Sequence, residues 1–157
     1  MSEIIFWRHA EAHDASDGQN DLDRKLTVKG QRQAERVAFW LDRNLPQHCK
    51  VFVSEAKRAQ QTARCLPRKH KTLAELNPDA RPQDVLAAIG WGVQAEPIVL
   101  IGHQPWMGEC IHWLLMEGMD GRAPLAVRKG AAWWLQSRAR EGGSEVIVRA
   151  VATPELM

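Results

Sequence analysis

Short unbroken apolar runs alternate along this chain with segments in which apolar residues recur every three or four positions. Three of the runs predict buried β-strands, at residues 4–7, 51–53 and 98–101. Two more strands are predicted at residues 131–135 and 146–151, joined across Gly142 and Gly143. Strands that are apolar without interruption are typical of a sheet covered on both faces.

Helical periodicity fills the intervals between these strands. Apolar residues at positions 34, 37, 38, 41 and 45 fall on one face, so a helix is predicted from an N-cap at Thr27 to a stop at Pro46. Three further helices are predicted: from Ser54 as a cap to Leu66, over residues 82–89, and after Pro105 through Met116. The polar residues 13–25 predict a loop.

The order of these elements predicts the class of fold. Strands alternating with helices are typical of α/β proteins, so we expect a three-layer α/β/α sandwich with a mostly parallel central sheet. A length of 157 residues predicts a single domain over residues 1–157.

Composition narrows the class of protein. Hydrophobic residues make up 45% and charged residues 25%, which is globular composition and excludes a disordered or fibrous chain. A net charge of +2 gives no reason to expect a nucleic-acid or membrane partner. The three cysteines have no metal-binding spacing and the N-terminus lacks a signal-peptide pattern, so free thiols and a cytoplasmic location are expected.

Cationic and protonatable side chains stand just beyond the ends of three predicted strands. Arg8 and His9 follow the first strand. Arg58 lies one helical turn beyond the second, and His103 follows the third. Ligands bind beyond the carboxyl ends of parallel strands, so these four side chains are expected to meet in one crevice. Arginine pairs well with phosphate oxygens and a neutral histidine can attack phosphorus, which makes a phosphoryl group the predicted ligand.

Other ligand classes have weaker support. His9 and His13 are four positions apart, as metal ligands on a helix can be, but the H-E-x-x-H order is missing and the segment joins a strand to a loop. P-loop and serine-hydrolase motifs are also missing from the sequence. Neither a metal nor another cofactor is therefore expected.

Four short blocks follow one another along the chain. They are Arg8-His9-Ala10, the segment from Arg24 to Gly30, the segment from Ser54 through Arg58 to Thr62, and Gly102-His103-Gln104-Pro105. Together they resemble the blocks of the histidine phosphatase (phosphoglycerate mutase-like) superfamily. The compact length resembles the SixA type of that family, the phosphohistidine phosphatases, which carry no large lid insertion.

The resemblance implies roles for the strand-end residues. It implies that His9 is the nucleophile that becomes phosphorylated, and that the phosphate pocket consists of Arg8, Arg58 and His103. One residue departs from the family pattern, because Ala10 stands where Gly is usual. Glycine permits a positive φ and close backbone approach, so Ala10 is tolerated only where the local backbone needs neither.

A general acid is harder to assign. Larger members of the family place a Glu shortly after the second block, and the segment around Glu75 is similar, so Glu75 is the candidate general acid. The alternative is that Glu75 is a solvated loop carboxylate. Glu11 and Asp14 lie nearer to His9 in the sequence and are weaker candidates.

The expected activity is that of a metal-independent phosphatase with a phosphohistidine intermediate, acting on phosphohistidine in a phosphorylated protein. Only 45 positions separate Arg58 from His103, which leaves little room for a lid, and an open site suits a phosphoryl group displayed on a protein. Two alternatives remain: a phosphatase of a small phosphate ester, and a non-catalytic module that binds phosphate or a phosphoprotein.

Overall fold

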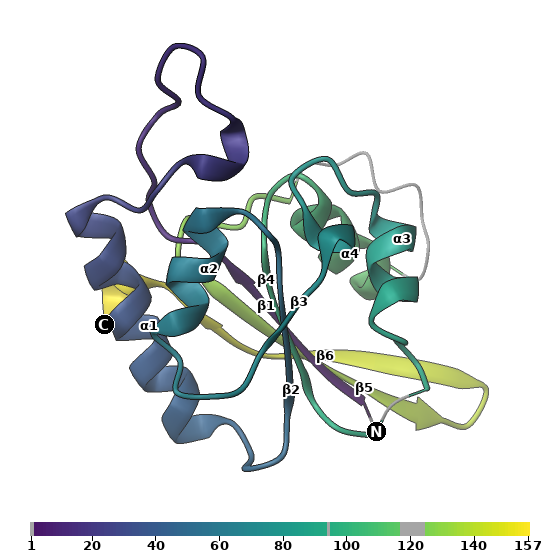
Figure 1. Ribbon diagram of the computed structural model, residues 1–157. Coiled ribbons are helices and arrows are strands. Elements are labelled where there is room, and N and C mark those ends of the chain that lie inside the picture. Colours follow the sequence, from purple (N-terminus) through teal and green to yellow (C-terminus); the bar gives the residue numbers. More distant parts are fainter. Residues whose placement is uncertain (1, 94, 117–124) are drawn as a thin grey trace.

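A computed structural model describes residues 2–93, 95–116 and 125–157, and a six-stranded sheet runs through these residues in the order β3-β2-β4-β1-β5-β6 (Figure 1). The strands are β1 (Ser2–Arg8), β2 (Lys50–Val53), β3 (Lys71–Thr72), β4 (Ile98–Gly102), β5 (Ala132–Arg140) and β6 (Gly143–Ala152). The first four strands are parallel to one another. β5 runs antiparallel to β1 and to β6. The predicted α/β class with a mostly parallel sheet is confirmed.

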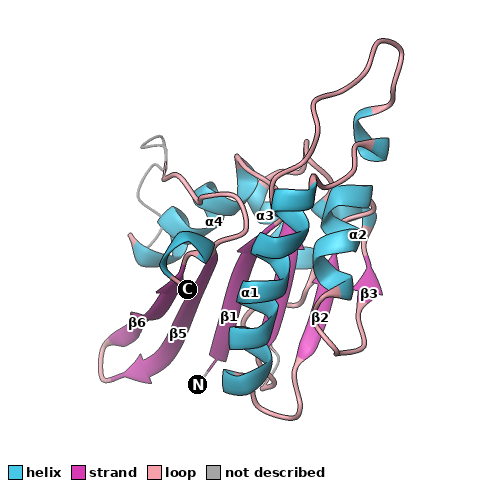
Figure 2. Cartoon of the chain, turned by 90° about the vertical axis from the view of Figure 1, so that its left-hand side faces the viewer, coloured by secondary structure: helices cyan, strands magenta, loops and turns pink. Residues whose placement is uncertain are grey.

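Helices cover both faces of the sheet (Figures 1 and 2). One face carries α1 (Val28–Asn44) and α2 (Lys57–Arg64), and the other carries α3 (Pro82–Ala88) and α4 (Trp106–Leu115). Three short 3-10 helices complete the described elements: η1 (Asp21–Asp23), η2 (Ala74–Leu76) and η3 (Pro154–Leu156).

Strand β1 shows why its sequence is apolar without interruption. Ile5 and Trp7 pack among the residues of α1 and α2, whereas Ile4 and Phe6 pack among those of α3 and α4. All four side chains are fully buried. Successive side chains of a strand point to opposite faces, so a strand with two covered faces needs apolar residues at every position.

The predicted strands and α-helices agree with the structure to within two residues at their ends, apart from three differences, and none of the three 3-10 helices was predicted. The hairpin of β5 and β6 is longer than the apolar runs, because its distal half is polar and partly exposed. The two-residue strand β3 was not predicted. Ser54 is not the cap of α2: the N-cap is Ala56, without a side-chain hydrogen bond, and the Ser54 hydroxyl accepts from the Ala56 N–H at 3.1 Å.

The start of α1 is tied to the segment that follows His9. The Thr27 hydroxyl accepts from the Gly30 N–H at 2.9 Å, which confirms Thr27 as the N-cap. The same hydroxyl donates to Oε2 of Glu11 at 2.7 Å, and the Thr27 N–H donates to the Glu11 carbonyl at 3.0 Å. Gly30 lies against that carbonyl, so the helix start and the site segment are packed backbone to backbone.

Replacing Gly30 with alanine tests this close approach. Helix propensity alone would make the change stabilising by about 1 kcal/mol. The new Cβ would overlap the Glu11 carbonyl, however, and overpacking of this kind typically costs about 1–3 kcal/mol. We expect a net loss in the free energy of unfolding, measured by urea denaturation. Lys29→Ala, an exposed neighbour in the same helix, is the control and should change stability by less than about 0.5 kcal/mol. A Gly30→Ala protein as stable as wild type would contradict the packing.

Candidate active site

The side chains predicted from the strand ends gather at one edge of the sheet. Arg8 is the last residue of β1 and His9 follows it. Arg58 lies in the first turn of α2, and His103 follows β4. Because β4 lies between β1 and β2, the three strand ends are neighbours. The ring centroids of His9 and His103 are 5.1 Å apart.

Hydrogen bonds hold both the backbone and the ring of His9. Its N–H donates to the Gly102 carbonyl, and its carbonyl accepts from the Gly130 N–H, both at 3.0 Å. The ring Nδ1 lies 2.7 Å from the carbonyl oxygen of Ala10. A carbonyl only accepts, so Nδ1 carries the proton of the neutral ring and Nε2 keeps its lone pair. A neutral imidazole with a free Nε2 can act as a nucleophile.

Two guanidinium groups of this cluster have unused hydrogen-bonding capacity. Arg8 donates through Nη1 to the Val127 carbonyl at 2.9 Å. Arg58 donates through Nη1 and Nη2 to the carbonyl and Oδ2 of Asp21, at 2.8 and 2.9 Å. The Nε atom of each arginine is buried and has no partner within the described residues. A buried donor without a partner costs free energy, and an anionic oxygen would satisfy it.

His103 has one ring nitrogen anchored to the scaffold. Its Nε2 lies 2.7 Å from the hydroxyl of Ser54, the residue that follows β2. Its Nδ1 is buried and, across the parts of the chain that the structure describes, has no hydrogen-bond partner. Nδ1 is therefore the ring nitrogen that is left for a ligand.

Both imidazoles are held neutral. The pKa of His9 is lowered to about 3, mainly by burial; the hydrogen bond to the Ala10 carbonyl opposes this shift, and the positive charges of Arg58 and Arg8 contribute to it. Burial also lowers the pKa of His103 to about 2, with His9 and Arg58 acting in the same direction and Asp21 in the opposite one. Burial, followed by the charge of Arg58, lowers the pKa of Arg8. Neutral imidazoles limit the repulsion that four cations at this edge would otherwise cause.

Asp21 supplies a negative charge that the sequence patterns did not reveal. It lies in the 13–25 segment, which rises beyond the strand ends in Figure 2. Besides Arg58, it binds Nη1 of Arg24 through Oδ1 at 2.9 Å. Desolvation raises the pKa of Asp21, but the hydrogen bonds from Arg24 and Arg58 outweigh it and hold this pKa below its ordinary value. Asp21 and Arg58 are 37 positions apart, so no local spacing could have paired them.

None of the carboxylates considered as general acids is hydrogen-bonded to the clustered side chains within the described residues. Glu75 is exposed in η2 and lines a hollow of about 650 Å³ beside α3. No hydrogen bond or ion pair within the described residues joins Glu75 to the four clustered side chains. Glu11 is bound to Thr27, and Asp14 is exposed in the loop after His9. An acid role for Glu75 therefore remains a prediction.

The segment that carries most of this cluster matches a known family. The model of the histidine phosphatase superfamily (branch 1) matches residues 4–90, more than half of the chain. The chain belongs to the histidine phosphatase superfamily. An uncharacterised protein of Picosynechococcus sp. is 37% identical over 120 residues, which cover 68% of this chain and 69% of that relative.

Solved structures share the fold of this histidine phosphatase superfamily member. A SixA protein of Agrobacterium tumefaciens has a TM-score of 0.77 and 24% identity, covering 97% of this chain and 98% of that one. The protein histidine phosphatase SixA complexed with tungstate has a TM-score of 0.72 and 24% identity, covering 98% of each chain. A phosphoserine phosphatase of Entamoeba histolytica, in complex with phosphoserine, has a TM-score of 0.74 and 15% identity over 99% of this chain and 98% of that one. These likenesses confirm the predicted phosphoglycerate mutase-like architecture.

Ala10 fits its place in this member of the histidine phosphatase superfamily. Its methyl group is fully buried in a small apolar cluster with Ala12, Leu26 and Ala34. Its N–H donates to the Thr62 hydroxyl at 3.2 Å. The Ala10 carbonyl and N–H are thus hydrogen-bonded to the His9 ring and to Thr62. The methyl group, which a glycine would lack, packs against apolar neighbours.

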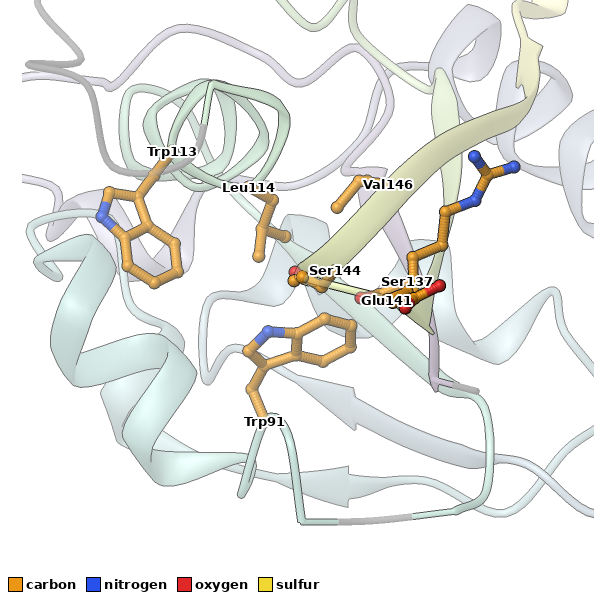
Figure 3. A pocket seen from close by; sticks show the side chains of 10 residues that line it. Trp91, Trp113, Leu114, Ser137, Glu141, Ser144 and Val146 are labelled. Carbon is orange, nitrogen blue, oxygen red and sulfur yellow. The ribbon is translucent and has the colours of Figure 1, made fainter.

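A separate hollow of about 670 Å³ is drawn in Figure 3. Trp91, Trp113 and Ser137 are among the residues that line it. Ser137 pairs with Ser2 at the beginning of β1, whereas His9 follows the end of that strand. Despite its size, this hollow is remote from the clustered side chains.

Two further observations concern metal binding and membrane insertion. No three His, Cys, Asp or Glu side chains in the described parts lie close enough together to hold a metal ion. None of the helices described has the length and apolar content needed to cross a membrane. The single domain and the cytoplasmic location stay predictions.

The depressed histidine pKa values predict a specific pH behaviour. The ring signals of His9 and His103, followed by NMR, should stay constant from pH 8 to pH 5, whereas an ordinary histidine titrates near 6.5. Below about pH 6.5 the two histidines are protonated in the unfolded chain but not in the folded chain. The free energy of unfolding must therefore fall as the pH decreases, with a slope that approaches about 1.4 kcal/mol per pH unit for each histidine. His9→Gln and His103→Gln assign the signals. A midpoint near 6.5 for either ring would contradict its burial as a neutral group.

Proposed function

We propose that this chain is a metal-independent phosphatase whose His9 forms a phosphohistidine intermediate, and that its substrate is phosphohistidine on a protein. The observation that carries the proposal is the largely buried cluster in which a neutral, oriented His9 stands beside three nitrogens that have no partner among the described residues: Nε of Arg8, Nε of Arg58 and Nδ1 of His103. Membership of the histidine phosphatase superfamily supports the same activity.

The first step forms a bond between Nε2 of His9 and phosphorus and breaks the bond to the leaving group. The lone pair comes from Nε2, because Nδ1 holds its proton against the Ala10 carbonyl. Charge develops on the non-bridging oxygens, and the Nε–H groups of Arg8 and Arg58 are available to bind them. The leaving group departs with the bonding electrons: the imidazole of phosphohistidine, protonated beforehand on its other ring nitrogen, leaves as neutral imidazole and needs no further proton.

The second step returns His9 to its starting state. A water oxygen attacks phosphorus, the bond between phosphorus and Nε2 breaks, and inorganic phosphate is released. The Ala10 carbonyl stabilises the ring proton on Nδ1 during both steps, because it accepts a hydrogen bond whether or not Nε2 carries phosphorus. The family resemblance assigns proton transfer to Glu75, which is exposed in η2 and has no hydrogen bond to the cluster within the described residues.

The chemistry of the leaving group supports phosphohistidine as the substrate in preference to an alcohol ester. An alcohol needs a proton from the enzyme as it leaves, whereas the imidazole of phosphohistidine leaves readily once its own ring is protonated. No carboxylic acid among the described residues is hydrogen-bonded to the imidazoles, and Asp21 is held ionised by two arginines. A site of this kind is better matched to a leaving group that carries its own proton.

The elements around the site also support a phosphorylated protein as the substrate. The interval between Arg58 and His103 is occupied by the rest of α2, by β3, η2 and α3, and by β4. The loop at residues 13–25 reaches the Arg58 side of the cluster, and its Asp21 is half exposed. A phosphorylated side chain on a protein surface can approach such an edge.

Trapping of a phosphoenzyme tests the proposed intermediate. A ³²P-labelled phosphoramidate donor should label the protein, and the label should survive base, be lost in acid and disappear in His9→Ala. His13→Ala is the matched control and should keep the label, because His13 is an exposed neighbour that contributes only backbone hydrogen bonds. Phosphate binding by the wild type without any label would favour the alternative of a non-catalytic binding module.

Comparison of substrates tests the finer assignment. A phosphohistidine peptide should be turned over at least tenfold faster, in kcat/KM, than a phosphoserine peptide of the same sequence or a small phosphate ester. His9→Ala should abolish all three activities, which shows that they share one site. A clear preference for phosphoserine or for the small ester would overturn the phosphohistidine assignment and leave the phosphatase activity in place.

A further inference from the structure

A chain of hydrogen bonds links Asn77, two residues beyond Glu75, to the imidazole of His103. The Ser54 hydroxyl lies 3.1 Å from Oδ1 of Asn77 and 2.7 Å from Nε2 of His103. The backbone N–H of Glu55 also donates to Oδ1 of Asn77, at 3.0 Å. The path crosses from η2 through the end of β2 to the residue after β4, so three separate elements meet in it.

The orientation of the Asn77 amide is determined by its two neighbours. The Glu55 N–H can only donate, so the atom that faces it must be the oxygen. The amide nitrogen lies 3.0 Å from Oε1 of Glu55, which can only accept when ionised. Both contacts agree, and a flipped amide would place like groups together at each end.

This orientation decides where the Ser54 proton points. Oδ1 of Asn77 has no proton, so the contact between it and the Ser54 oxygen requires the proton of the hydroxyl. The Ser54 oxygen then has only lone pairs left, and it accepts from the Ala56 N–H at 3.1 Å. Its remaining contact, with Nε2 of His103, therefore requires a proton on Nε2.

We propose that Asn77 is a positioning residue that, through Ser54, holds neutral His103 in the tautomer with its proton on Nε2. Nδ1 of the ring is then a hydrogen-bond acceptor in the free protein. This inference rests on the proposed function only in taking Nδ1 as the nitrogen that meets the phosphoryl group. The buried Nδ1 has no partner within the described residues, as expected for a group reserved for a ligand.

The tautomer has a consequence for the phosphoryl group that the site accepts. A phosphoryl oxygen without a proton would face the Nδ1 lone pair and be repelled by it. The oxygen that meets His103 must therefore carry a proton, which it shares with Nδ1, while the other oxygens take the N–H groups of Arg8 and Arg58. Asn77 thus determines that a monoprotonated phosphoryl group fits this pocket better than a fully ionised one.

Nitrogen NMR of protein labelled with ¹⁵N-histidine tests the assignment, because a protonated ring nitrogen and an unprotonated one differ in chemical shift by tens of ppm. In the wild type at pH 7, His103 should show a protonated Nε2 and an unprotonated Nδ1. In Asn77→Ala the freed Ser54 hydroxyl can donate to Nε2, so a population with the proton on Nδ1 should appear. Asn77→Asp combined with Glu55→Ala, which removes the carboxylate that would face the new one, keeps an acceptor for Ser54 and should restore the wild-type pattern.

Two further variants keep the test decisive. Glu55→Ala removes the partner of the Asn77 amide nitrogen and leaves Oδ1 in place, so the wild-type pattern should persist. Ser54→Ala breaks the chain at its centre and should release the tautomer even where Asn77→Ala fails to fold. An unchanged pattern in the folded Asn77 or Ser54 alanine variant, or a wild-type ring protonated on Nδ1, would overturn the inference. The measurement needs no turnover, so an inactive protein with the expected pattern would refute the proposed function alone.

Discussion

Four nitrogen-rich side chains, three of them buried and Arg8 half-buried, meet at one edge of the sheet, and the rest of the site depends on this constraint. Guanidinium and imidazole groups lose hydration there, and acceptors from the described residues replace it only in part. The two imidazoles respond by staying neutral, and the two arginines keep their charge. The outcome is a pocket that is cationic, partly unsatisfied and suited to an anion with several oxygens.

Part of the cost of lost hydration is offset by hydrogen bonds to backbone and side-chain acceptors that lie far from the two arginines in the sequence. The Val127 carbonyl takes one hydrogen bond from Arg8, and Asp21 takes two from Arg58. Each acceptor binds Nη atoms, and Nε of each arginine has no partner in the part of the chain that the structure describes. The arginines are therefore anchored on one side and available on the other, an arrangement that positions a ligand more exactly than free surface arginines could.

Each histidine is oriented by an acceptor on the nitrogen that does not face the ligand. The Ala10 carbonyl serves His9, and the Ser54 hydroxyl serves His103. The two rings therefore differ in which nitrogen is protonated, although both are neutral and lie side by side. His9 offers the lone pair of Nε2 for attack, while His103 offers Nδ1 to a phosphoryl oxygen. The same residue type thus serves two purposes because the local acceptors differ.

Much of this protein was determined by local sequence. Apolar runs and helical periodicity were sufficient to place β1, β2, β4 and the helices, since burial on two faces or on one face leaves distinct patterns. Because parallel strands end at a common edge, the same patterns predicted that Arg8, His9, Arg58 and His103 would meet. Ser54 shows the limit of local reasoning: a serine before a helix is a good cap by pattern, yet its hydroxyl is used by Asn77 and His103.

Only the tertiary structure decided which hydrogen-bond partners the clustered side chains have. Asp21 and Asn77 carry no local signal, because their partners lie 37 and 23 positions away and are brought close by strand order and loop path. The tautomers likewise follow from contacts between elements that are separate in the sequence. Sequence determines which groups a chain can present at the end of a strand. Which acceptor faces each nitrogen, and hence where each proton lies, depends on distances that exist only after the strands have paired.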